Sequence, residues 1–136
     1  MFLDASVVVA LLAGESEEEA IRAALSEADT IVTSPIAMFE ASSRLSRLLR
    51  TSFLDAYEGV VAFNAAMNVR VIDITAEIGR QAHLCADRYH HLSGHPARLN
   101  LGDCFAYAAA RASGLKLAYK GNDFIHTDIE GQRFGS

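Results

Sequence analysis

Short apolar runs alternate with amphipathic stretches along the whole chain. Four runs have the length and composition of buried strands, at residues 2–3, 31–33, 69–72 and 115–119. Apolar side chains recur at helical spacing between them, which predicts helices at about 7–12, 16–25, 35–50, 52–67, 75–89 and 100–113. This alternation is typical of βαβ units around a parallel sheet, so the sequence predicts an α/β fold, with turns and one edge strand in the tail.

Most of the predicted helices begin at a capping signal. Ser34 as N-cap and Pro35 at the first helical position predict the start of the helix that contains Glu40. Ser16 with Glu19 predicts a capping box for the second helix. The cap residues predicted for the three later helices are Ser52, Thr75 and Asn100.

Length and composition predict one compact domain over residues 1–136. The chain has 136 residues, 51% of them apolar, and a mean hydropathy of +0.15. That is enough for one hydrophobic core, and neither an internal repeat nor a flexible linker interrupts it. Disorder is therefore excluded as the main state.

The charge balance narrows the possible partners. Twelve Lys and Arg residues stand against 17 Asp and Glu residues, for a net charge of -5. The field of the whole molecule therefore repels phosphate, so any nucleic acid must be held by local positive charge or by bound cations.

Cysteine usage and the N-terminal residues predict a cytoplasmic protein. Cys85 and Cys104 are too few for a disulfide framework or a thiolate zinc site, which predicts buried free thiols. The first apolar run has no preceding basic residues and is interrupted by Asp4, so neither a signal peptide nor a membrane span is expected.

Four acidic residues stand out by their positions in this arrangement. Asp4 ends the first predicted strand and Asp123 follows the fourth. Asp103 lies in the first turn of its helix and Glu40 in the second turn of another. Ligands of an open parallel sheet bind beyond the carboxyl ends of its strands, so we expect the four carboxylates to share one pocket.

Clustered carboxylates favour a divalent metal site. They cannot all stay ionised unless a cation offsets their repulsion, and oxygen ligands favour Mg²⁺ or Mn²⁺. The five histidines lack the paired spacing that zinc sites use.

Each acid also has an ordinary structural explanation. Asp4 suits the N-cap of the following helix, and Asp103 is stabilised at a helix N-terminus without any ligand. Glu40 has a candidate ion-pair partner in Arg44, although its other neighbours are apolar. Asp123 lies in a Gly-Asn-Asp turn, where such residues serve backbone geometry. The apolar neighbours of Glu40 and Asp103 nevertheless favour a functional role for those two, whereas only the combination of the four favours one for Asp123.

Four segments carry a resemblance to a known family. They are FLDASVVVALL, SPIAMFEASSRL, LNLGDCFAYAAARASGLKL and YKGNDFIHTDI. In their order and spacing the chain resembles the PIN domain and, within it, the VapC toxins of bacterial type II toxin–antitoxin pairs. The resemblance implies an α/β/α sandwich with a central parallel sheet of four to five strands. It also implies a metal-dependent endoribonuclease with Mg²⁺ or Mn²⁺ as cofactor.

The resemblance further implies which residues form the site. Its acidic cluster falls on Asp4, Glu40, Asp103 and Asp123. Asp4 belongs to the opening Asp-x-Ser motif, with Ser6 as its hydroxyl. Spacing after the last strand varies in the family, so Asp123 is the first choice for the fourth acid and Asp128, beside Thr127, is the reserve.

Metal-assisted hydrolysis assigns a role to each acid. Asp4 and Asp103 are expected to coordinate the metal directly, and Asp123 to add a second coordination or position the water. Glu40 is expected to orient or deprotonate that water.

Local positive charge is present in two places. Arginines recur every three residues on the helix of Glu40, at Arg44, Arg47 and Arg50. For any one of them, a solvated helix face is a simpler explanation than contact with RNA. Residues 90–99 contain three histidines and Arg98, and such a loop before Asp103 is the better candidate for phosphate contact. Expected substrate contacts are Ser6, Arg98, Thr127 and Asp128.

Two other functions are compatible with the same residues. A non-catalytic binding module would use the acids to hold a structural cation or a partner's arginine. A metal-dependent DNA nuclease or phosphatase would use the same carboxylates, and no reader of the 2′-hydroxyl is recognisable. The resemblance favours RNA, and it implies an antitoxin partner, a homodimer or hetero-oligomer, and no membrane.

Overall fold

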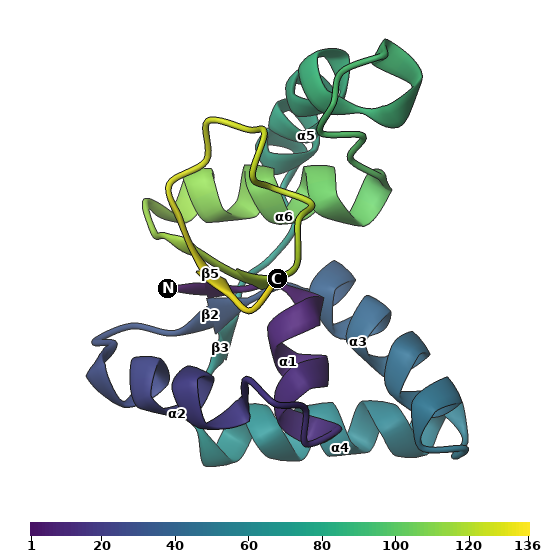
Figure 1. Cartoon of the computed structure of the whole chain (residues 1–136), viewed down its shortest axis with the longest axis vertical. Coiled ribbons are helices and arrows are strands. Elements are labelled where there is room, and N and C mark those ends of the chain that lie inside the picture. The colour runs from purple at the N-terminus through teal and green to yellow at the C-terminus, as the bar shows by residue number, and fades with distance from the viewer.

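A parallel sheet of five strands lies at the centre of the computed structural model, which describes residues 1–136 (Figure 1). The strands are β1 (Phe2–Leu3), β2 (Val32–Thr33), β3 (Arg70–Val71), β4 (Leu117–Lys120) and β5 (Gly131–Phe134). Their order is β3-β2-β1-β4-β5 and every pair is parallel. The expected edge strand in the tail is therefore present.

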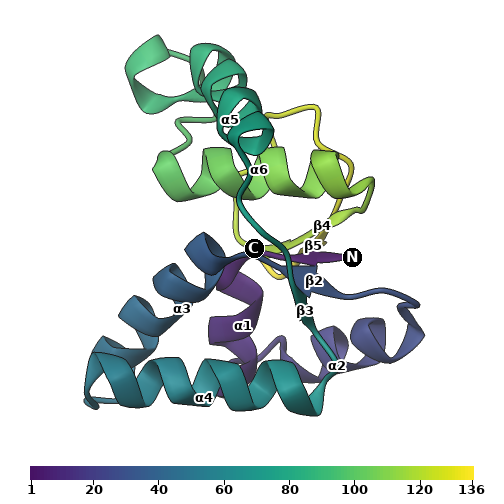
Figure 2. The same ribbon diagram turned by 180° about the vertical axis from the view of Figure 1, so that it is seen from behind.

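Helices cover both faces of the sheet. They are α1 (Ala5–Leu12), α2 (Glu18–Glu27), α3 (Pro35–Leu48), α4 (Phe53–Ala66), α5 (Ala76–Tyr89) and α6 (Leu101–Ser113). Figures 1 and 2 show α5 and α6 on one face and the other four helices on the opposite face. The expected α/β/α arrangement is confirmed.

Alternation along the short strands divides the core into two halves. Phe2 and Leu117 pack into the cluster under α5 and α6, whereas Leu3 and Ala118 pack into the cluster that α1 to α4 cover. Successive side chains of a strand point to opposite faces, so even a two-residue strand contributes to both clusters.

The capping signals are mostly confirmed. The side chains of Ser34, Ser52, Thr75 and Asn100 each accept a hydrogen bond from the first turn of their helix. The capping box expected at Ser16 and Glu19 is wrong, because α2 begins at Glu18 and no side chain caps it. The carboxylate of Glu17, at the N-cap position, lies 2.8 Å from the Lys120 ammonium in a tertiary ion pair and accepts no capping hydrogen bond from the helix.

Smaller features complete the comparison with the sequence. The expected loop at residues 90–99 contains a 3₁₀ turn, His91–Ser93, and an isolated bridge between His90 and Leu99. Cys85 and Cys104 are buried free thiols, as expected. None of the helices combines the length and apolar character needed to cross a membrane.

Two glycines allow a matched test of the packing. A Cβ at Gly131 would lie 2.8 Å from the backbone oxygen of Leu117, whereas a Cβ at Gly59 in α4 would meet nothing within 4 Å. We expect Gly131→Ala to lower the free energy of unfolding by about 1–3 kcal/mol. Gly59→Ala is expected to raise it by up to about 1 kcal/mol, because alanine favours the helix. Urea unfolding followed by circular dichroism measures both, and shifts of the same sign would contradict the assigned strand register.

Candidate active site

The strand order reverses beside β1. The chain runs from β1 to β2 and β3 in one direction, and then places β4 and β5 on the other side of β1. Ligands of open parallel sheets bind at such a reversal, at the carboxyl ends of the two strands between which the order changes, here β1 and β4. Asp4 directly follows β1 and Asp123 follows β4.

Asp4 is both the N-cap of α1 and a buried carboxylate at this edge of the sheet. Its Oδ2 accepts hydrogen bonds from the Ser6 backbone N–H at 3.0 Å and from the Ser6 hydroxyl at 2.5 Å. That hydroxyl in turn accepts a bond from the Lys120 backbone N–H at 2.9 Å, which ties the site to the end of β4. The Asp4 Oδ1 atom has no hydrogen-bond partner, so one oxygen is available to a ligand.

Asp103 is held in the same manner at the start of α6. Its Oδ2 accepts a hydrogen bond from the Asn100 backbone N–H at 3.0 Å, and its own N–H donates to the Asn100 side chain at 2.9 Å. This capping box leaves Oδ1 of Asp103 unbonded. The structural explanation and the functional one are therefore compatible, since each residue caps a helix with one oxygen and leaves the other free.

Glu40 approaches α6 at its one glycine. A Cβ built on Gly102 would lie 1.6 Å from the Glu40 Oε1 atom, so the Glu40 carboxylate occupies the space that any other residue at position 102 would fill. α3 thereby brings Glu40 beside the first turn of α6, where Asp103 lies. Sequence reasoning missed this close approach, although a glycine in the first turn of a helix was a visible signal.

Burial and mutual repulsion raise the pKa values of three of the acids. Asp4 and Asp103 are only 7% and 6% exposed. Burial is the largest cause of the raised pKa of Asp4, Glu40 and Asp103. The pKa of Asp103 rises to about 7. The charge of Asp123 raises the pKa of all three, so the structure brings the four acids into one electrostatic cluster.

Arg44 is a cation beside this cluster. Its guanidinium lowers the pKa of both Asp4 and Glu40, in opposition to burial. The ion pair considered for Glu40 and Arg44 does not form in the structure, where Arg44 makes no salt bridge.

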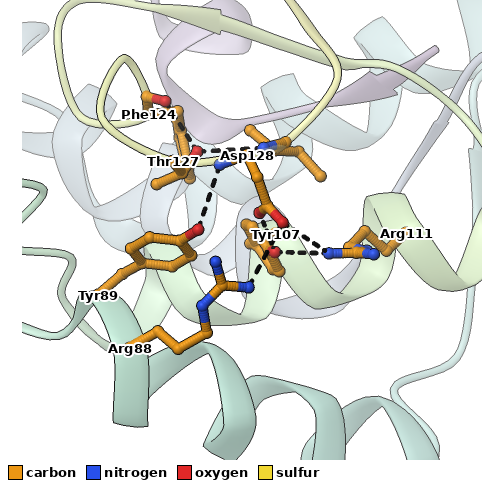
Figure 3. Close-up of polar contacts among 8 residues, drawn as sticks. Arg88, Tyr89, Tyr107, Arg111, Phe124, Thr127 and Asp128 are labelled. Atoms are coloured by element: carbon orange, nitrogen blue, oxygen red, sulfur yellow. Dashed lines mark hydrogen bonds and ion pairs between the residues drawn. The ribbon is translucent and has the colours of Figure 1, made fainter.

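Asp128 lies in a different polar network (Figure 3). Its carboxylate accepts hydrogen bonds from the Tyr107 hydroxyl and from Arg88 at 3.4 Å, and Arg111 lies at 3.5 Å. The hydrogen bond from Tyr107 is the main cause that lowers the pKa of Asp128. The pKa of Tyr107 is raised to about 12, mainly by burial and next by its hydrogen bond to Asp128. This network attaches the tail to α5 and α6, and the structure does not bring Asp128 into the acidic cluster.

The remaining expected substrate contacts are placed as follows. The Thr127 hydroxyl donates to the Phe124 carbonyl at 2.8 Å, which closes the turn after Asp123. Arg98 is exposed and has a φ of 51°, so its backbone lies in the left-handed region just before α6. Ser6 is the one of the four that contacts a cluster acid directly.

Comparison with known proteins assigns this arrangement to a family. A family model of the PIN domain matches residues 1–130. A VapC ribonuclease from Rhizobium meliloti is 43% identical over 94% of this chain and 98% of its own length. Ribonuclease VapC42 from Mycobacterium tuberculosis is 34% identical over 95% of this chain and 96% of its own length. The chain belongs to the VapC ribonucleases of the PIN-domain family.

Solved structures agree with this assignment. VapC20 from Mycobacterium tuberculosis, described as a toxin that cleaves the sarcin–ricin loop, has a TM-score of 0.64 and 26% identity, covering 87% of this chain and 85% of its own. VapBC2 from Rickettsia felis, solved with promoter DNA, has a TM-score of 0.70 and 14% identity, covering 98% and 97%, and its likeness concerns the fold alone. The expectations of a PIN-type α/β fold and a VapC ribonuclease toxin are confirmed.

The donor set of this VapC site fits a hard divalent cation. No three histidine, cysteine or acidic side chains stand close enough to enclose a metal by themselves. Mg²⁺ does not need such a cage, because it keeps several waters and binds through one or two carboxylates. The unbonded Oδ1 atoms of Asp4 and Asp103 are oxygen donors of that kind, and a cation beside them would relieve the repulsion among the acids.

The raised pKa of Asp103 predicts a pH effect on stability. Between the ordinary value of 3.8 and about 7, the folded chain holds a proton that the unfolded chain has lost. The stability of the metal-free protein therefore falls as the pH rises through that window. We expect Asp103→Asn to remove this contribution to the pH dependence of the free energy of unfolding. The contribution is about 1.4 kcal/mol for each unit by which the pKa of Asp103 differs between the folded and unfolded chains.

The measurement is urea unfolding in excess chelator at several pH values from 4.5 to 7.5. Asp55→Asn is the matched control, because Asp55 occupies the same position in the first turn of α4 but is exposed. Equal pH slopes for the wild type and Asp103→Asn would show that Asp103 ionises normally.

Proposed function

We propose that this chain is a Mg²⁺- or Mn²⁺-dependent endoribonuclease that hydrolyses RNA phosphodiester bonds at the cluster of Asp4, Glu40, Asp103 and Asp123. The observation that carries the proposal is the burial of several like-charged carboxylates at the carboxyl ends of β1 and β4. Membership of the VapC ribonucleases supports RNA as the substrate.

In this proposal the metal is held by Asp4 and Asp103. Each carboxylate is fixed through its Oδ2 by a neighbouring backbone N–H, which leaves its Oδ1 without a hydrogen-bond partner. A divalent cation bound there supplies a water of lowered pKa and offsets negative charge on the phosphate. Ser6 positions Asp4, and through the Lys120 backbone it couples Asp4 to β4.

Glu40 and Asp123 act on the water and on the phosphate side of the site. Burial raises the pKa of Glu40, which suits a group that takes a proton from the attacking water near neutral pH. Asp123 is exposed on the turn that the buried Phe124 anchors, so it adds a coordination or positions the water from the open side.

The proposal includes an antitoxin as the protein partner and the cytoplasm as the location. The structural neighbours include a toxin–antitoxin complex from Klebsiella pneumoniae, of like fold at 18% identity and a TM-score of 0.66. α3 and α4 expose Phe39, Phe53, Leu54 and Tyr57 around one hollow, and an apolar surface of this kind marks a site of protein association. We therefore include an antitoxin as partner of the single PIN domain, in a homodimer or hetero-oligomer.

Cleavage of RNA by the purified, antitoxin-free protein tests the proposal. We expect cleavage with Mg²⁺ or Mn²⁺ and none in excess chelator. Asp103→Asn should lower the rate at least 100-fold, because one of two direct metal ligands loses its charge. Asp55→Asn, the same change at the same helix position of α4, should retain the wild-type rate. Metal-independent cleavage, or an active Asp103→Asn protein, would contradict the mechanism. Cleavage of DNA but not of RNA would contradict the assignment of RNA as the substrate.

The contact between Gly102 and Glu40 yields a second expectation. The Cβ of Gly102→Ala collides with the end of a flexible side chain, so the fold should survive while the Glu40 carboxylate is displaced. We expect a loss of at least tenfold in kcat with a melting temperature close to that of the wild type. Gly79→Ala in α5 is the control, since its Cβ meets nothing within 4 Å. A Gly102→Ala protein with full activity would separate Glu40 from the reaction.

A further inference from the structure

A stripe of charge on α3 continues away from the acidic cluster. Glu40, Arg44 and Arg47 are spaced by four and three residues, so they lie on one face of the helix. Arg44 is half-buried and Arg47 is exposed. At about 1.5 Å per residue the stripe extends about 10 Å from Glu40 to Arg47.

Both arginines have free donors. Four other arginines form ion pairs with acidic side chains, namely Arg22, Arg80, Arg88 and Arg111. Arg44 and Arg47 make neither a salt bridge nor a side-chain hydrogen bond. Neither guanidinium is therefore engaged in a direct ion pair, although the charge of Arg44 acts at longer range on Asp4 and Glu40.

The two guanidinium groups share a surface hollow. It has a volume of about 450 Å³, and its walls are Val9, Glu15, Arg44, Arg47 and Leu48, from the α1 and α3 sides. Glu15, the one acid in this wall, is already paired with the Lys120 ammonium. The hollow is thus locally positive although the chain as a whole carries a net charge of -5.

We propose that Arg44 and Arg47 bind the RNA backbone beside the scissile bond, so that the strand leaves the acidic cluster along α3. This inference rests on the proposed function. A chain with this net charge repels phosphate and needs local cations to hold RNA. Arginine suits the task because its planar guanidinium binds phosphate in a bidentate manner. Arg44 lies between the hollow and the acidic cluster, since its charge also lowers the pKa of Asp4 and Glu40.

One simpler role for Arg44 is to offset the charge of the acids. That role explains the position of Arg44, but it does not explain Arg47, which is exposed, unpaired and one turn further along the same face. The two roles also differ in what they change: charge compensation affects the acids and their metal, whereas phosphate binding affects RNA affinity and its dependence on salt.

The test measures binding of a fluorescent single-stranded RNA by anisotropy, from 50 to 400 mM salt with Mg²⁺ present. All proteins carry Asp103→Asn to prevent cleavage. Arg44→Gln and Arg47→Gln are compared with Arg22→Gln, which removes the same charge from α2. Each lost phosphate contact should lower the slope of log affinity against log salt by about 0.7. A variant that lacks one contact and binds as the wild type does at 1 M salt should therefore bind about fivefold more weakly than the wild type at 0.1 M salt.

Further variants keep the result decisive. Arg44→Lys retains the charge and should recover most of the salt slope, and Arg47 is exposed enough that its change cannot disturb the core. In the active background, Arg44→Gln and Arg47→Gln should raise KM more than they lower kcat. An unchanged salt slope in both glutamine variants, or equal losses in Arg22→Gln, would overturn the inference. Absence of cleavage by the wild type would instead count against the proposed function, since the binding measurement does not depend on it.

Discussion

Repulsion between buried carboxylates is the constraint on which this structure depends. Asp4 and Asp103 are almost fully buried, and burial together with neighbouring negative charge raises the pKa of each. Such an arrangement costs folding free energy without a compensating cation, because both desolvation and like charge disfavour the ionised forms. The fold tolerates this cost at one edge of the sheet, where hydrogen bonds from Ser6 and Asn100 hold one oxygen of each carboxylate.

The two halves of the core deliver the acids from opposite sides. Asp4 caps α1 in the layer below the sheet, and Asp103 lies at the start of α6 in the layer above it (Figure 1). β1 lies between β2 and β4, so the segments after β1 and β4 lie side by side at the carboxyl edge of the sheet. Gly102 then admits Glu40 from α3, which a side chain at that position would exclude. The packing of helices from both layers against the sheet therefore brings the acids together.

The tail illustrates how similar residues acquire different tasks. Asp123 and Asp128 are five residues apart in one polar segment, and either is compatible with the family pattern. Asp128 is surrounded by Tyr107, Arg88 and Arg111, and these donors stabilise its charge and attach the tail to α5 and α6 (Figure 3). Asp123 has no such donors, and its charge acts on the other acids. This contrast supports Asp123 as the fourth member of the cluster.

Local signals in the sequence determined the fold class, four of the helix starts and the identity of the candidate acids. Periodicity and capping depend on residues three or four apart, so a single sequence contains them. Tertiary structure alone decided that Glu17 pairs with Lys120, because that contact spans more than 100 residues. It also decided the approach of Glu40 to Gly102 and the position of Arg44 beside the acids. Those features depend on how helices distant in sequence pack, and local patterns do not encode such distances.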